Sequence, residues 1–130
     1  MSSSEISHNP RIIVIQKLYS YFVNKDASLK YPKHRYKKFI KDVVNGTLER
    51  NEVIDNEINL HLKDDIDVRR IDKVFEVILK SAIFELLYKP TTSSNIIIKE
   101  YLNASNFFID LSQTKFLNAV LDKLSKKIRS

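Results

Sequence analysis

Apolar side chains recur every three or four positions through most of this 130-residue chain and rarely alternate with polar ones. A spacing of three and four places side chains on one face of an α-helix, whereas a half-buried strand alternates with period two. The pattern predicts an all-α protein, a compact bundle of about six to seven helices. Six segments carry the helical spacing: residues 10–23, 33–49, 51–63, 68–88, 95–109 and 113–128.

Local signals mark several ends of these helices. Asn9 followed by Pro10 is typical of an N-cap and a first helical position. Asp67 and Ser112 are the predicted N-caps of the fourth and last helices, and Pro90 ends the fourth. The fourth segment has the widest apolar stripe, so we expect it to be the central helix, contacted on several sides.

The residue inventory excludes several kinds of site. The chain has no cysteine, which excludes disulfides, thiolate zinc sites and cysteine nucleophiles. Its single glycine, Gly46, allows no Gly-rich phosphate loop and lies inside a predicted helix, where we expect it to permit close packing. The three histidines lack metal-binding spacing, and the acids at 64–67 lack an EF-hand's glycine and glutamate, so we interpret them as helix-start acids. We expect no catalytic residue, metal, cofactor or small-molecule substrate, and an enzyme is the least favoured alternative.

Length and the character of the first residues set expectations for organisation. We expect residues 1–9 to be a disordered tail and residues 10–130 to form one helical domain. The start has no apolar signal-peptide core, and no apolar run approaches the ~18 residues of a membrane span. A cytoplasmic protein with no membrane partner is the simplest expectation.

The chain has a formal net charge of +6, and its charged residues are distributed unevenly along the sequence. Residues 1–50 carry ten Lys/Arg against four Asp/Glu, residues 51–90 six against nine, and residues 91–130 six against three. The densest basic segment has interleaved tyrosines at 31 and 36, a combination that suits a phosphate backbone and unpaired bases but also suits a plain solvated helix face. Its cations are Lys30, Lys33, Arg35, Lys37, Lys38 and Lys41.

Four short blocks, in order, resemble the bacterial NusB transcription antitermination family. They are Arg11-(x4)-Gln-Lys-Leu-Tyr-Ser at 11–20, Ile-Leu-Lys-Ser-Ala-Ile-Phe-Glu-Leu-Leu at 78–87, Ile-Lys-Glu-Tyr at 98–101, and Lys-Phe-Leu-Asn-Ala-Val-Leu-Asp-Lys at 115–123. The resemblance covers roughly residues 10–129 and implies an all-α fold of two packed helical subdomains. It also implies a non-enzymatic role: binding boxA-type RNA with the ribosomal protein that acts as NusE, alongside RNA polymerase and other Nus factors, in support of ribosomal RNA transcription.

The resemblance also implies which residues contact RNA. Tyr19 and Phe116 match aromatic residues of the family's RNA face, where single-stranded bases stack. Phosphate and base contacts would come from the same motifs, through Arg11, Gln16, Lys115 and Asn118. Glu85 and Glu100 also match family motifs, and we expect structural roles for them.

The acidic middle of the chain suggests a protein contact. Asp72, Glu76 and their neighbours are expected to face the basic ribosomal partner, since complementary potentials favour encounter. An ordinary charged helix surface is the simpler alternative.

Departures from the family pattern leave a second interpretation open. Family members usually carry an arginine-rich N-terminal arm, but here only Arg11 remains of it. Lys33, Arg35 and Lys37 of the basic segment would replace that arm if they fold onto the same face. If they do not, the chain is a NusB-fold adaptor for protein contacts that has lost specific RNA binding.

Overall fold

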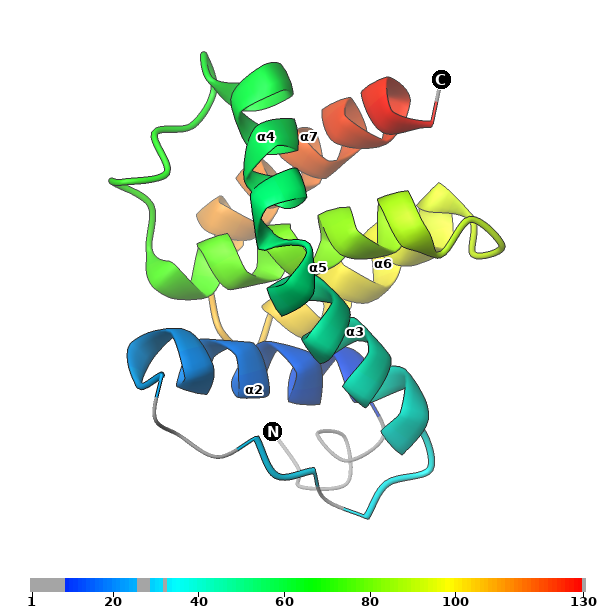
Figure 1. The fold of residues 1–130 in the computed structure, drawn as a ribbon. Coiled ribbons are helices and arrows are strands. Elements are labelled where there is room, and N and C mark those ends of the chain that lie inside the picture. The colour runs from blue at the N-terminus through cyan, green and yellow to red at the C-terminus, as the bar shows by residue number, and fades with distance from the viewer. Residues whose placement is uncertain (1–8, 26–28, 32, 130) are drawn as a thin grey trace.

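A computed structural model describes residues 9–25, 29–31 and 33–129, so all of the predicted tail except Asn9 lies outside the described residues. The described residues form helices and connecting turns without a strand, which confirms the all-α prediction. None of these helices is long and apolar enough to span a membrane. The helices are α2 (Pro10–Val23), α3 (Lys37–Glu49), α4 (Asn51–Leu62), α5 (Lys73–Tyr88), α6 (Ser94–Ser105) and α7 (Leu111–Ile128) (Figure 1).

Helix α5 is the centre of the fold, as its wide apolar stripe predicts. It contacts each of the other five helices, and every residue from Phe75 to Leu86 is buried. Helices α2 and α3 pack together on one side of α5, and α4 and α7 pack together on another (Figure 1). The core therefore lies around α5, and the groups at its two ends are placed by several helices at once.

Gly46 permits the closest approach between α3 and α5. A Cβ atom added at this position would overlap the ring of Phe84 on α5. The expectation that this glycine serves helix packing is therefore confirmed.

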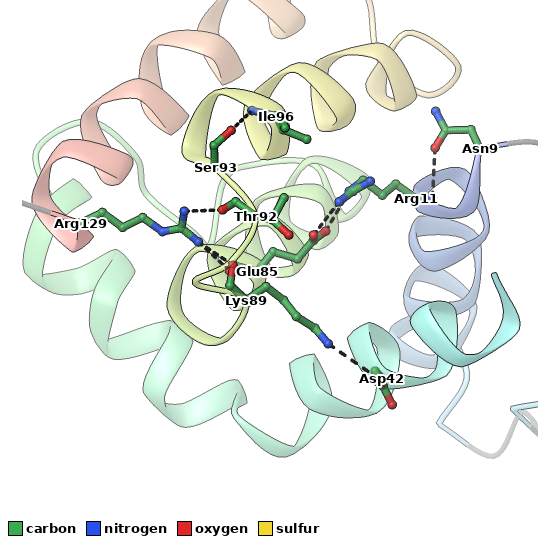
Figure 2. A network of polar contacts seen from close by, with 9 residues as sticks. All are labelled: Asn9, Arg11, Asp42, Glu85, Lys89, Thr92, Ser93, Ile96 and Arg129. Carbon is green, nitrogen blue, oxygen red and sulfur yellow. Dashed lines mark hydrogen bonds and ion pairs between the residues drawn. The ribbon is translucent and has the colours of Figure 1, made fainter.

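The C-terminal end of α5 is held by polar contacts (Figure 2). Arg129, just after α7, donates hydrogen bonds to the backbone carbonyls of Glu85, Leu86, Lys89 and Thr92 at 2.6–3.2 Å. The last carbonyls of a helix have no partner within the helix, so one guanidinium satisfies several of them. The side chain of Glu85 points the other way, to Arg11 on α2.

Three helix starts differ from the sequence prediction. Helix α3 begins at Lys37 rather than at residue 33. Helix α5 begins at Lys73 rather than near residue 68, and the Asp67 carboxylate accepts the backbone N–H of Arg69 in a turn before the helix. Helix α7 is capped by Asp110, not Ser112: Asp110 accepts from the backbone N–H of Gln113, whose side chain accepts from the Asp110 backbone. This reciprocal capping box satisfies two donors, which one serine cannot do.

The acidic cluster and the end of α6 also differ from expectation. Asp64 and Asp65 lie in the turn that follows α4, so they are not helix-start acids, and Asp65 accepts from Lys123 Nζ at 2.7 Å. Helix α6 ends at Ser105 instead of residue 109, and the next residues form turns in which Phe107 and Phe108 donate backbone hydrogen bonds to Ala104 and Ser105.

Candidate nucleic-acid interface

Two exposed aromatic side chains flank the N-terminal end of α5. Tyr19 on α2 is 43% exposed and Phe116 on α7 is 42% exposed. Tyr19 lines a hollow of about 580 Å³, and Phe116 lines a second of about 310 Å³. Asp72, the N-cap residue of α5, lines both hollows, so the two are adjacent. We call them together the aromatic groove.

Phe116 is held in place by a buried neighbour. Its ring stacks on that of Phe75, with centroids 5.7 Å apart and planes 24° from parallel. Phe75 is buried in the core. A ring that is fixed on one face and exposed elsewhere can accept a flat partner without first being ordered. The α5–α7 packing therefore builds a preformed stacking surface.

The Tyr19 side of the groove is formed by α2 and the start of α5. Gln16 and Tyr19 are three residues apart on α2, hence on one helix face. Val74 and Phe108 supply apolar floor to the same hollow, and Lys73 supplies a cation. This combination of a stacking ring, an amide and a cation suits an unpaired nucleotide.

Sequence reasoning missed several residues of the groove. Arg70 and Gln113 line the Phe116 hollow, and Lys73 lines the Tyr19 hollow. Gln113 donates from its side chain to Asp72 at 3.0 Å, which joins the starts of α5 and α7. The capping-box spacing of Asp110 and Gln113 was the available signal for that junction.

Arg11 is placed inside the protein rather than in the groove. Its guanidinium donates to Glu85 through Nε at 2.9 Å and Nη2 at 2.7 Å. The side chain is 10% exposed and lies over the rings of Phe39 and Tyr101. This geometry gives Arg11 a structural role and confirms the structural role expected for Glu85. The phosphate contact expected of Arg11 stays a prediction.

The two residues expected to meet a protein partner are placed differently. Asp72 is exposed at the junction of the two hollows. Glu76 is buried and accepts from Lys73 at 3.2 Å and Lys80 at 3.0 Å. Since its carboxylate is engaged within the chain, Glu76 is better suited to position α5 than to touch a partner.

The remaining predicted RNA contacts are exposed but line neither hollow. Lys115 neighbours Phe116 on α7, whereas Asn118 points about 200° around the helix from Phe116. Lys33, Arg35 and Lys37 lie at or just before the start of α3. That start lies near the Pro10 end of α2, away from the start of α5 (Figure 1).

In the described part of the chain, no three His, Asp or Glu side chains gather in a geometry that could hold a metal ion. What the start of α5 offers instead is aromatic surface and charge. A family model described as the NusB family matches residues 8–126.

The chain belongs to the NusB family.

Individual relatives agree with this membership. The transcription antitermination protein NusB of Rickettsia conorii is 29% identical over 122 residues, which span 88% of this chain and 76% of that protein. NusB of Bradyrhizobium diazoefficiens is 28% identical over 91 residues, or 70% of this chain and 55% of that protein. The solved structure of T. maritima NusB superposes with a TM-score of 0.77 at 22% identity, covering 92% of this chain and 91% of that one. This NusB fold is the one that brings Tyr19 and Phe116 to the same end of α5.

Proposed function

We propose that this NusB-family chain is an antitermination factor that binds boxA-type single-stranded RNA together with the ribosomal protein that acts as NusE, supporting ribosomal RNA transcription. The observation that carries the proposal is the aromatic groove, in which Tyr19 and Phe116 are exposed side chains in adjacent hollows. Unpaired bases stack on such rings, and each stack is worth about 1–3 kcal/mol.

The groove residues have distinct proposed roles. Tyr19 and Phe116 stack on bases, and Gln16 reads a base edge beside Tyr19. Lys115, next to Phe116 on α7, contacts a phosphate. Asn118 remains a proposed contact for RNA that wraps around α7, and Lys33, Arg35 and Lys37 remain proposed contacts for RNA outside the groove.

The placement of Asp72 supports joint binding of RNA and protein. A basic ribosomal protein that pairs with this exposed carboxylate sits beside both hollows. It would remove a negative charge that repels phosphate from the middle of the groove. The two ligands therefore favour each other, and RNA polymerase and other Nus factors join the resulting complex.

Fluorescence anisotropy of a labelled boxA-type RNA tests this proposal. The protein is titrated alone and with the ribosomal partner, at about 50 mM and about 200 mM salt. We expect binding that the partner strengthens, that a scrambled RNA does not reproduce, and that weakens steeply with salt. Y19A and F116A should each weaken binding roughly 5- to 150-fold, from the loss of one stacked base.

Y88A is the matched control variant. Tyr88 is 37% exposed at the other end of α5 and lines neither hollow of the groove. Its substitution should leave RNA affinity unchanged. Partner binding with no preference for boxA-type over scrambled RNA would overturn the proposal in favour of the protein-interaction adaptor.

A further inference from the structure

We propose that Arg69 and Arg70, in the turn before α5, carry the RNA backbone along the Phe116 side of the aromatic groove. This inference rests on the proposed RNA-binding function and names the cations that act there. The chain keeps only Arg11 at the place of the family's basic arm, and Arg11 is buried against Glu85. Lys73 supplies a cation to the Tyr19 hollow, and Arg70 is the cation in the lining of the Phe116 hollow.

The turn places both guanidinium groups in solvent beside the groove. The side chains of Arg69 and Arg70 are 91% and 87% exposed, and Arg70 lines the same hollow as Phe116. A phosphate that follows a base stacked on Phe116 thus meets a cation in the wall of that hollow. Arginine suits this task because its planar fork donates two parallel hydrogen bonds to a phosphate.

The Asp67 carboxylate contacts the Nε atoms of both arginines and so orients their guanidinium groups. It accepts from Arg69 Nε at 3.3 Å and lies 3.5 Å from Arg70 Nε. Hydrogen bonds from the Arg69 side chain and backbone N–H lower the pKa of Asp67, so the anchor stays ionised at neutral pH. Only the Nε atoms are used in this way, and within the described residues the outer nitrogens of both arginines have no protein partner.

The carboxylates near the two arginines are already engaged within the chain. The Phe116 hollow is lined by one cation, Arg70, and one carboxylate, Asp72. Asp72 already accepts from the Gln113 side chain, and Asp67 is engaged by the arginines. The basic segment before α3 adds nothing here, since none of its cations lines the groove.

The salt dependence of RNA binding tests the role of the two arginines. The slope of log Kd against log salt for boxA-type RNA is measured by anisotropy for wild type, R69Q/R70Q and R69K/R70K. Each single-strand phosphate contact contributes about 0.7 to that slope. R69Q/R70Q should therefore lower the slope by about 1.4 and weaken binding roughly ten- to thirtyfold at about 0.1 M salt. R69K/R70K should retain the slope, because it keeps both charges.

The control variant K99Q/K126Q removes the same net charge from exposed positions on α6 and α7 that line neither hollow. It should leave the slope within about 0.3 of wild type. A wild-type slope in R69Q/R70Q, while F116A still loses affinity, would overturn this inference and leave the proposed function standing. Failure of the wild-type protein to prefer boxA-type RNA would instead overturn the proposed function itself.

Discussion

Arg11 and Glu85 are 74 positions apart in the sequence and form a two-pronged ion pair between α2 and α5. Glu85 is fully buried, so the pair lies in surroundings where an unpartnered charge is costly. The arginine that sequence comparison places in the RNA-binding motif thus fixes α2 against α5. Through α2 it also sets the position of Tyr19 relative to the start of α5.

Replacing Arg11 alone should destabilise the fold more than replacing both Arg11 and Glu85. In R11M the Glu85 carboxylate loses the one cation that pairs with it among the described residues, and breaking such a buried pair typically costs about 3–5 kcal/mol. R11M/E85M removes both charges and should recover most of that loss, because a well-packed apolar pair is often neutral relative to an ion pair. Urea unfolding curves measure both. A single variant as stable as wild type would contradict this account of the pair.

Gly46→Ala should lower stability although alanine favours a helix. The added Cβ overlaps the Phe84 ring, and overpacking typically costs about 1–3 kcal/mol, against roughly 1 kcal/mol gained in helix propensity. We expect a net loss of up to about 2 kcal/mol, seen as a lower Tm in circular dichroism melts. In the F84L background the same substitution should cost less, since leucine can vacate the space. A raised Tm for G46A in the wild-type background is the result that this packing does not allow.

Tyr101 should make stability depend on alkaline pH. Burial, together with the negative charge of Glu85, raises the pKa of Tyr101 well above its ordinary value near 10. Above pH 10 the unfolded chain loses this proton while the folded chain keeps it, so the free energy of unfolding falls by up to ~1.4 kcal/mol per pH unit. Y101F should decline less steeply over that range.

At neutral pH the same substitution should cost little. The Tyr101 hydroxyl has no hydrogen-bond partner among the described residues, so its removal leaves no group newly unsatisfied. Denaturant midpoints at pH 7 and across pH 9–11 compare the two proteins. Parallel pH curves for wild type and Y101F would show that Tyr101 does not titrate in this way.

Much of the fold could be predicted because helical periodicity is a strong signal. The bounds of α2 agree with the prediction at both ends, and at its start Asn9 accepts from the Arg11 backbone N–H as an N-cap while Pro10 is the first helical residue. The start of α5 could not be placed as well. Asp67 is a good N-cap residue, yet its side chain accepts a hydrogen bond in the turn before the helix, and Asp72 occupies the N-cap position of α5. Local propensity does not reveal which of two possible caps the packing selects.

Some residues of the candidate site could be predicted from the sequence, and others could not. Tyr19 and Phe116 come to one end of α5, a result that motif resemblance anticipated and burial supports. The burial of Arg11 and Glu76 could not be predicted from the sequence. A charged residue that is buried in an ion pair cannot be told from an exposed charged residue until the fold brings its partner to it. Arg70 was missed for the opposite reason: next to three aspartates it resembles part of a self-neutralising turn, and only the fold brings it to Phe116.

The most direct test of the account is a single-tryptophan reporter. The chain has no tryptophan, so F116W places one fluorophore in the groove and Y88W places one at the far end of α5. If bases stack on residue 116, boxA-type RNA should quench F116W fluorescence over the concentration range in which anisotropy reports binding, and should leave Y88W unchanged. Unaltered F116W emission at saturating RNA would contradict the central claim that this groove binds the RNA.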